Sequence, residues 1–422
     1  MSFRFDSFHA SSAAELRQGL RSVLDGYRAL LPSSPGARVV LKPNFNSNMN
    51  ALTGNTTDLR LLAALVLVLR EFGYHRIAIA EGTNSGFYRN RISVMERLAV
   101  GRFARRLGVE LLDLNYAEPY PVPFGDVTAY VARECVEADL FINVPKLKTH
   151  FEMGMSVCLK NMMGCLLGQE NKKKTHLSLS ANILRLNEVL KPHLHVVDAL
   201  IAMEGLGPTR GTPVRLDQVL VGTDPLLLDL AAAKLARFEP GKVGTLRAAE
   251  AAGLLTDEHR AFVASLELDV ASRPFAPPVA GALAGFIHSP RRQKYFLMVR
   301  NTRFFSWLAS TGWFGHLLFL TGLRQDVFCH EDSACQGLSV DGSVCDGCGV
   351  CARVCPMELD LPKTEVREDD GCIRCLYCYS ACPRRAIRFL GELGFFREQL
   401  RQYDARIRSL YGGSSGSDRN GR

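Results

Sequence analysis

The sequence lacks several features that would place the chain in a simple functional class. Its first residues, "MSFRFDSFHASSAAELRQGL", contain no long apolar stretch and carry acidic residues early, which is not typical of a secretory signal or a transit peptide. No G-x-G-x-x-G follows a strand-like run and no G-x-x-x-x-G-K-[ST] occurs, so neither a dinucleotide site nor a P-loop is predicted. We expect a cytoplasmic protein.

The sequence also has no arginine-rich arm. The formal net charge is +8, but the 51 Lys and Arg residues are dispersed among 43 acidic ones. An RNA-binding aromatic signature is missing as well. The balance predicts no nucleic-acid partner and a mild preference for anionic partners of other kinds.

Hydrophobic patterning predicts an α/β fold with a largely parallel sheet for the N-terminal domain. At 422 residues the chain exceeds the size at which one core usually stops growing, so more than one domain is expected. Strand-like runs alternate with helical patterns, such as 58–72 with Asp58 as N-cap and 177–190. The predicted strands are "RVVL" ending at Leu41, "RIAIA" at Ala80, "VELL" at Leu112, "DLFINV" at Val144, "LHVVD" at Asp198 and "QVLV" at Val221.

Composition shifts divide the rest of the chain. The stretch "SRPFAPP", residues 272–278, breaks the α/β pattern and indicates a linker. The predicted divisions are an α/β domain over 1–272, a linker with an aromatic helical segment over 273–335, a small C-terminal α+β domain over 336–392, and a helix with a flexible tail over 393–422.

The aromatic segment 304–323 contains no Lys, Arg, Asp or Glu over twenty residues. Its length would allow a membrane span, but His316, two glycines and several hydroxyls make its hydrophobicity modest. Three alternatives stay open: a helix pair that docks between domains, an aromatic peripheral membrane contact with basic flanks, or a true span. The protein is therefore expected to be cytoplasmic with membrane association left open.

The cysteines give the strongest signal. The chain reads "CDGCGVCARVCP" from Cys345 and "CIRCLYCYSACP" from Cys372, and each run is C-x2-C-x2-C-x3-C-P, the spacing by which bacterial ferredoxins hold cubane clusters. Because the fourth cysteine of such a run reaches the other cluster, we predict two 4Fe-4S clusters. Cluster 1 would use Cys345, Cys348, Cys351 and Cys382, and cluster 2 would use Cys372, Cys375, Cys378 and Cys355.

Other cysteine interpretations are weaker. Paired C-x2-C motifs also bind zinc, but two complete runs with both prolines argue against it. Cys329 and Cys335 are expected to be structural or to belong to another ligand set. Cys158 and Cys165 are only weak redox candidates, because free cysteines are commonly buried as small hydrophobes.

Polar residues follow several predicted strands, and side-by-side strands would bring them to one edge of the sheet. Lysines there would bind an anion as point charges, and glycines would let backbone amides approach it. Each lysine taken alone is more simply a solvated surface charge. We assign Lys146, Lys148, His150 and Lys160 as candidate catalytic residues, and Lys42, Asn44, Glu81, Asn161, Gly207 and Gly211 as candidate substrate-binding residues.

Two of these roles have direct alternatives. His150 could act as a general acid or base, or it could hydrogen-bond a loop. Asp198, Glu204 and Asp224 could hold a divalent metal, although Asp224 before Pro225 suits a helix N-cap. Whether a flavin or a divalent metal completes the site stays open.

The motifs together resemble a known family. The set "LKPN", "DLFINVPKLKTH", "LKNMMG", "MEGLGPTRG" and "GTDPLLLD", within about 39–236, is similar to domain of unknown function 362, which is often fused to a two-cluster ferredoxin. The resemblance implies an iron-sulfur-associated α/β protein but no settled reaction.

Two functional hypotheses follow. The first is an oxidoreductase whose ferredoxin domain relays single electrons to an anionic small molecule held in a lysine-lined cleft, with a redox protein as partner. The second is a non-catalytic electron carrier or maturation factor that docks on a protein or a membrane surface. The substrate, the direction of electron flow and the oligomeric state are not predicted.

Overall fold

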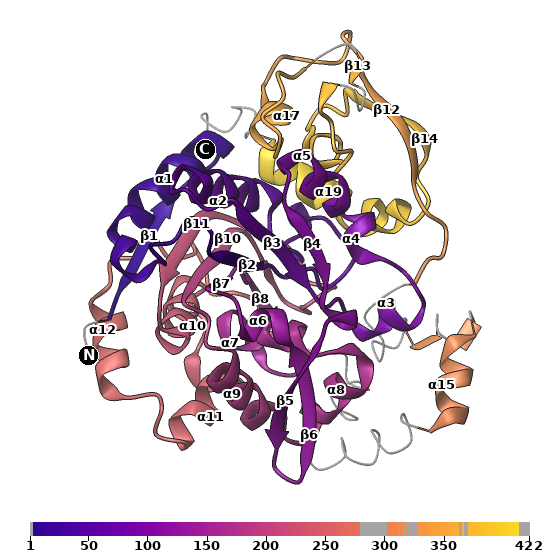
Figure 1. The fold of residues 1–422 in the computed structure, drawn as a ribbon. Helices are drawn as coiled ribbons and strands as arrows, with labels where there is room; N and C mark the ends of the chain where they lie inside the picture. Colours follow the sequence, from indigo (N-terminus) through magenta and orange to yellow (C-terminus); the bar gives the residue numbers. More distant parts are fainter. Residues whose placement is uncertain are drawn as a thin grey trace, which may run out of the picture.

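The computed structural model describes residues 3–278, 302–311, 313–314, 317–318, 328–362, 365–366 and 370–412. Its α/β part is built on a central sheet flanked by helices, and the C-terminal part packs beside the sheet (Figure 1). The sheet contains nine strands within these ranges. They are β1 Phe5–His9, β2 Arg38–Lys42, β3 Arg76–Glu81, β4 Glu110–Asp113, β7 Leu140–Asn143, β8 Lys146–His150, β9 Gly154–Ser156, β10 Leu194–Glu204 and β11 Thr212–Gly222.

The sheet is parallel at its centre and antiparallel at one side. Its strand order is β1-β11-β10-β7-β2-β3-β4. Strands β10, β7, β2, β3 and β4 pair in parallel, whereas β11 pairs antiparallel with both β10 and β1. The prediction of a largely parallel α/β sheet is confirmed, and the six predicted strands all form. The antiparallel side arises because β10 and β11 are joined by a short loop.

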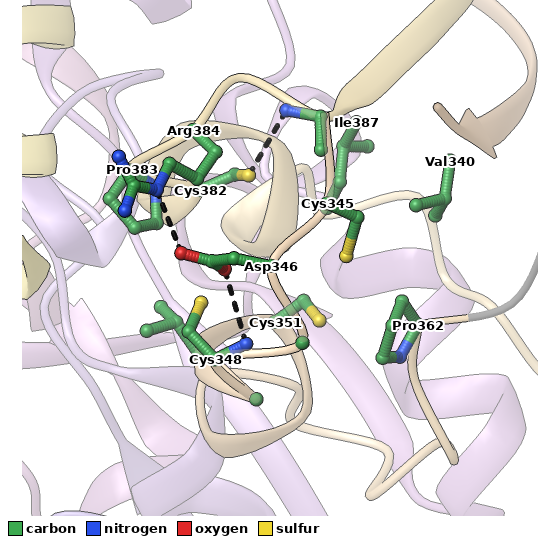
Figure 2. A pocket seen from close by; sticks show the side chains of 14 residues that line it. Val340, Cys345, Asp346, Cys348, Cys351, Pro362, Cys382, Pro383, Arg384 and Ile387 are labelled. Atoms are coloured by element: carbon green, nitrogen blue, oxygen red, sulfur yellow. Dashed lines mark hydrogen bonds and ion pairs between the residues drawn. The ribbon is translucent and has the colours of Figure 1, made fainter. Parts of the chain in front are cut away.

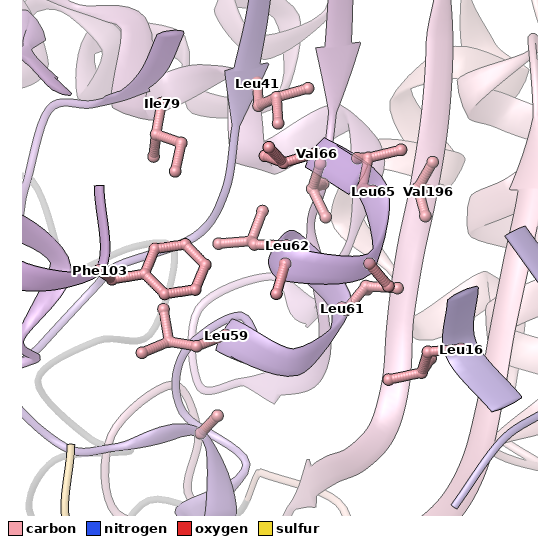
Figure 3. Packing of buried hydrophobic residues seen from close by; sticks show 14 of the residues in the cluster. Leu16, Leu41, Leu59, Leu61, Leu62, Leu65, Val66, Ile79, Phe103 and Val196 are labelled. Carbon is pink, nitrogen blue, oxygen red and sulfur yellow. The ribbon is translucent and has the colours of Figure 1, made fainter. Parts of the chain in front are cut away.

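Alternating residues of the strands face two separate hydrophobic layers. Val39 and Leu41 of β2 belong to one buried cluster, and Val40 between them belongs to another, as the pleat of a strand requires. Figure 3 shows the first layer, where Leu62 and Phe103 pack beside Leu41. The sheet is therefore covered on both faces, as parallel sheets generally are.

Helix starts follow local sequence signals. Asp58 accepts a hydrogen bond from Arg60 N at the start of α2, and Asp224 accepts from Leu226 N and Leu227 N at the start of α10. These are N-caps, which confirms both predicted caps. The α/β helices are α1 Ala13–Gly26, α2 Leu59–Glu71, α3 Ser85–Arg89, α4 Val94–Arg97, α5 Val100–Leu107, α6 Arg133–Val136, α7 Cys158–Asn161, α8 Gly168–Thr175, α9 Leu179–Leu190, α10 Pro225–Leu235, α11 Gly244–Ala251 and α12 Asp257–Ser265.

The segment after "FINV" differs from the prediction. The predicted strand was expected to end at Val144 and to be followed by polar residues at the sheet edge, but residues 146–150 form strand β8, which pairs in parallel with β10 and antiparallel with β9. Pro145 lies between β7 and β8 and has no N–H with which to continue the ladder of β7. The apolar run therefore ends near this proline, although the backbone after it stays extended as β8. A hairpin of β5 Pro119–Phe124 and β6 Val127–Ala132 was also not predicted.

The C-terminal part is a small α+β unit, as predicted. Its antiparallel sheet has the order β13-β12-β14, formed by Glu365–Val366, Ala334–Val340 and Ile387–Glu392. Helices α17 Val350–Arg353 and α18 Tyr377–Ala381 carry cysteines, and α19 Phe396–Tyr411 runs back onto the α/β domain, where the Tyr403 hydroxyl donates to Thr209 O over 2.7 Å. The two parts are thus held together by direct contacts.

The linker region holds α15 Arg303–Ser310. Within the described residues, no helix is long and apolar enough to cross a bilayer. Part of the predicted 304–323 segment and the tail 413–422 lie outside the described residues.

Candidate iron–sulfur centre and adjoining buried charges

Three cysteines of the first run and the last cysteine of the second run line one cavity. Cys345, Cys348, Cys351 and Cys382 all line it, with about 340 Å³ of space that is partly open to solvent (Figure 2). Gly347 lies between the first two cysteines with a φ of +71°, a left-handed conformation that side chains disfavour, so the tight loop needs glycine there. The four thiols are soft donors suited to iron and sulfide, and they are the set predicted for cluster 1.

The remaining four cysteines form a second group, in which Cys355 is buried and the other three are partly buried. Electrostatic interactions connect Cys355 with Cys372, Cys375 and Cys378, so the fourth cysteine of the first run lies by the other loop. Burial raises the pKa of Cys375 and Cys378 well above the usual range. Their thiolates would therefore need the positive charge of bound iron, which suits a cluster site. The ligand assignments themselves stay predictions.

Cys329 and Cys335 do not line the cavity of the first group, and Cys335 interacts electrostatically with Cys372 of the second. Cys335 is on β12 and its thiol donates to Gly337 O over 3.7 Å, while Cys329 O accepts from Arg97 Nη1 over 2.7 Å. Both side chains pack against the small hydrophobic cluster of the C-terminal unit. Their surroundings are those of structural residues.

The second cysteine loop contacts the α/β domain directly. The Tyr377 hydroxyl, between Cys375 and Cys378 in sequence, accepts from Leu59 N over 3.3 Å at the first turn of α2. Next to it, Asn50 N donates to Gln399 Oε1 over 2.8 Å. The buried cysteine loop and the N-terminus of α2 therefore form one continuous structure.

A buried ionic network begins at that contact. Asp58 is paired with Arg60 at 2.7 Å, Asp58 N donates to Asp198 Oδ2 over 2.7 Å, and Lys146 Nζ donates to the same oxygen over 2.9 Å. Burial raises the pKa of Asp198, whereas Arg60 outweighs burial at Asp58 and lowers its pKa. The charges balance in pairs, as buried ions require.

A second ion pair lies at the ends of β2 and β3. Lys42 Nζ is 2.8 Å from Glu81 Oε1, and Glu81 Oε2 accepts from Phe45 N over 2.8 Å. A Cβ on Gly164 would lie 2.2 Å from Glu81 Oε1 and 2.5 Å from Lys42 Nζ. The glycine of "LKNMMG" is thus explained by close packing against this pair.

A chain of amides joins the remaining polar residues. Lys148 Nζ donates to Asn44 Oδ1 over 2.8 Å, Asn44 Nδ2 donates to Asn161 Oδ1 over 2.8 Å, and Asn161 Nδ2 donates to Asn143 Oδ1 over 2.7 Å. These polar strand ends do converge, as expected. A fully satisfied network of this kind fixes the geometry of the surrounding strands.

The predicted positions of several candidates need correction. Lys146, Lys148 and His150 were expected on the rim of a cleft, but all three are buried, and both lysines are bonded inside the chain. Lys42, a predicted substrate-binding residue, is also buried and pairs with Glu81. Glu81 is likewise committed to Lys42. The reason is that β8 continues the sheet, which carries its side chains into the interior. Their roles in catalysis or substrate binding stay predictions.

The glycine-rich loop also serves packing. Gly207 N donates to Gly205 O over 2.7 Å, so it is not available to an anion, and a Cβ on Gly207 would lie 2.1 Å from Thr149 O. A Cβ on Gly211 would lie 2.3 Å from Glu204 O. These glycines let the loop lie against β8 and β10.

The proposed carboxylate metal site is dispersed among other partners. Asp198 binds Lys146, Glu204 pairs with Arg273, and Asp224 caps α10 and contacts His259 Nε2 at 3.3 Å. Among the residues that the structure describes, no three His, Cys, Asp or Glu side chains are arranged to hold a single metal ion.

Lys160 is the candidate that differs from the other lysines. It lies on α7 and is partly exposed, and its amine forms no hydrogen bond or ion pair with any described residue. Desolvation lowers its pKa to about 8, opposed by the charge of Glu152. A lysine of this kind can donate to a bound anion or give up a proton near neutrality.

His150 and Glu152 interact electrostatically with this amine, and His176 interacts with both of them. Burial, then the charge of Lys160, lowers the pKa of His150 well below its usual value. Its Nδ1 accepts from Glu152 N over 3.1 Å, which leaves the proton of the neutral ring on Nε2. His176 Nδ1 lies 3.6 Å from Glu152 Oε1 and lowers the pKa of that carboxyl to about 2. We call Lys160, His150, Glu152 and His176 the Lys160 corner.

Sequence reasoning missed several residues of the interior. Lys172 donates to Gly82 O, Thr83 O and Asn115 Oδ1 and is buried, although it stands in a run of three lysines. The sequence did not indicate a role for Arg60, because this residue lies within an otherwise apolar helix. It did not indicate one for Tyr377 either, because this residue lies between cysteines that were read as cluster ligands. Position within the α/β pattern could have marked Lys172, since α8 follows the "LKNMMG" segment.

The fold and the cysteine geometry define an α/β domain joined to an iron–sulfur electron-transfer domain. Comparison with known families agrees: residues 39–234 match the domain of unknown function DUF362, and residues 337–383 match the 4Fe-4S dicluster domain. The chain thus joins a DUF362 domain to a C-terminal 4Fe-4S dicluster domain, as the sequence motifs predicted. It binds iron–sulfur clusters and functions in electron transfer.

Two curated proteins are similar to the chain. The thylakoid-associated protein sll1697 of Synechocystis is 27% identical over 269 residues, which cover 60% of this chain and 78% of that protein. An uncharacterized protein of Methanocaldococcus jannaschii, MJ0749, is 40% identical over 52 residues, 12% of this chain and 20% of that protein.

Proposed function

We propose that the dicluster domain exchanges single electrons between a redox protein and an anionic small molecule held at the Lys160 corner. The observation that carries this proposal is that the two cysteine groups have different surroundings. Cys348 of the first group is exposed, whereas Cys375 and Cys378 of the second pack against the α/β core. When bound, a 4Fe-4S cubane accepts or releases one electron at a time. The first group therefore suits an external redox partner and the second suits exchange with the α/β domain.

The contacts between the second group and the sheet support this direction. Tyr377 reaches the first turn of α2, and Asp58 there connects through Asp198 to Lys146 on β8. On the same strand, Lys148 and His150 follow within four residues of Lys146. Polar groups that are already fixed in place need little rearrangement when an electron arrives. This favours electron exchange along the contacts that lead from Tyr377 through Asp58 and Asp198 to β8.

Lys160 and His150 would act on the substrate. The Lys160 amine has no acceptor within the part of the chain that the structure describes, so in its charged form it can pair with a carboxylate or phosphate and stabilise negative charge that develops on reduction. His150 Nε2–H can donate a hydrogen bond to the same molecule. Since Lys160 titrates near pH 8, it can also supply the proton that follows the electron.

A thermal-shift screen tests the binding part of this proposal. The holoprotein is heated with a panel of carboxylates and sugar phosphates, beside a Lys160→Met variant and a Lys173→Met control. Lys173 is a suitable control because it forms an exposed ion pair with Glu170 at 3.1 Å. We expect at least one anion to stabilise the wild type and the control but not Lys160→Met. Equal stabilisation of all three proteins would contradict the assignment of the site.

A second candidate function is an electron carrier that works at a membrane surface. It is favoured by the exposed aromatic helix α15 and by the name of the thylakoid-associated relative. Cell fractionation tests this location: the protein should sediment with membranes and be released by high salt or carbonate. Recovery entirely in the supernatant at low salt would contradict it.

A further inference from the structure

We infer that the exposed side chains of α15 and of the described residues that follow it form a docking surface for a bilayer that contains anionic phospholipid. This inference rests on the proposed location at a membrane and adds to it the residues and the lipid class. The docking surface consists of Phe304, Trp307, Trp313 and Leu317.

The first argument is exposure. Phe304, Trp307 and Trp313 are 69%, 63% and 68% exposed, and Leu317 is 46% exposed. Large aromatic side chains normally bury most of their area in a protein. Several of them exposed together in one short segment mark an interaction site.

The second argument is the way the segment is built. α15 begins at an N-cap in which Thr302 accepts from Phe305 N, and it ends at Thr311, where the chain becomes extended. The half-buried rings of Phe305 and Phe314 then meet edge to face with centroids 6.0 Å apart. This contact ties the helix to the described residues that follow it and leaves the docking surface on the outside. Figure 1 places α15 at the edge of the molecule, outside the layers of the α/β domain.

The third argument is charge. Between residues 291 and 324 there are six Lys and Arg residues and no Asp or Glu, whereas the whole chain has 51 basic and 43 acidic residues. Tryptophan and phenylalanine prefer the interfacial zone of a bilayer, and cations beside them are attracted to anionic headgroups. The combination matches a peripheral contact. Within the described residues no helix could span a bilayer, which agrees with a contact at the surface.

The occupant of this surface is therefore an anionic membrane rather than a second copy of the chain. Residues 291–324 carry a net charge of +6 in the sequence, so two copies of this segment would repel each other, and like charges oppose association.

Intrinsic fluorescence provides a selective test, because Trp307 and Trp313 are the two tryptophans of the chain. The holoprotein is mixed with vesicles of phosphatidylcholine alone or with added phosphatidylglycerol. We expect a blue shift of tryptophan emission, and quenching by brominated acyl chains, only with the anionic vesicles and less at high salt. An emission shift that depends on protein concentration without vesicles would instead indicate self-association and overturn the inference.

Sedimentation with the same vesicles separates this inference from the proposed location. A Phe304→Ser/Trp307→Ser variant should bind at least tenfold more weakly than wild type, and Tyr116→Ser, which removes an aromatic ring 73% exposed elsewhere, should bind like wild type. Unchanged iron content shows that each variant is folded. If the wild type and the double variant bind anionic vesicles equally, the docking surface is wrong and the location stands. If the wild type binds neither kind of vesicle, both are wrong.

Discussion

Replacing Lys146 with methionine tests whether the interior of the α/β domain is built on charge pairs. Lys146 Nζ and Asp198 Oδ2 are 2.9 Å apart, and both side chains are 0% exposed. Removing one partner of a buried pair typically costs 3–5 kcal/mol, because a buried charge is left without compensation. Asp198 would still accept from Asp58 N and Leu200 N, so we expect a loss near the lower limit, about 3 kcal/mol.

The loss should depend on pH in a definite direction. Burial raises the pKa of Asp198, and without the lysine the carboxyl would be protonated in the folded variant at a higher pH still. A folded-state pKa above the unfolded value of about 3.9 means that stability is fully present below that value and is lost as pH rises through the folded pKa. Lys146→Met should therefore be less destabilised at about pH 5.5 than at about pH 7.5.

Anaerobic urea denaturation followed by far-UV circular dichroism measures both effects. Lys146→Met/Asp198→Asn should recover part of the lost stability, since it leaves no unpaired charge. Lys173→Met is the control, because its exposed pair with Glu170 should change stability by less than about 0.5 kcal/mol. The reasoning is refuted if Lys146→Met unfolds at the same urea concentration as the control.

Three further predictions follow from the same structure. Burial lowers the pKa of His195 to about 3, and burial together with the charge of Lys160 lowers the pKa of His150. The contribution of each histidine to folding stability is therefore fully present above the pKa of the unfolded chain, about 6.5, and is lost as pH falls below it. The loss should amount to about 1.4 kcal/mol per pH unit for each histidine. His195→Gln should halve that slope in urea titrations, and an unchanged slope would contradict it. Trace acetylation with peptide mapping should show Lys160 reaching half-maximal reactivity near pH 8, below the ordinary pKa of lysine, about 10.4; half-maximal reactivity of Lys160 near that ordinary value would exclude the lowered pKa. Cys382→Ser and Cys345→Ser should each lose cluster 1, reduce iron from about eight to about four per chain, and leave the paramagnetic signal of cluster 2. Cys355→Ser should instead lose cluster 2 and leave the signal of cluster 1. The same signal from Cys382→Ser and Cys355→Ser would contradict the crossed ligation.

Much of the fold could be predicted because it depends on local patterns. β-branched runs such as the one ending at Leu41 formed parallel strands, and Asp58 and Asp224 capped helices as their positions indicated. Cysteine spacing indicated the dicluster domain because the geometry of the loop is contained in one short segment.

The environment of the lysines could not be predicted, because burial is decided by which strands pair. A polar "KLKTH" gives no local sign that it will become an interior strand, and only the pairing of β8 with β10 places Lys146 beside Asp198. The same holds for the contact of Tyr377 with Leu59, which joins residues over 300 positions apart. One consequence is practical: loss of turnover in a Lys146 variant would reflect lost stability, so Lys160 is the residue with which to test function.

The central claim, that the dicluster domain exchanges electrons with an anion at the Lys160 corner, is tested most directly by anaerobic reoxidation. The protein is reduced with dithionite, desalted, and mixed with each anion that gave a thermal shift, while the visible absorption of the clusters is followed. We predict that at least one anion restores the absorption of the wild type and of Lys173→Met, and that Lys160→Met, with the same iron content, is slower by at least about 100-fold, as expected for the loss of a group that stabilises developing charge. Reoxidation of Lys160→Met at the wild-type rate, or no reoxidation of the wild type by any stabilising anion, would contradict the claim.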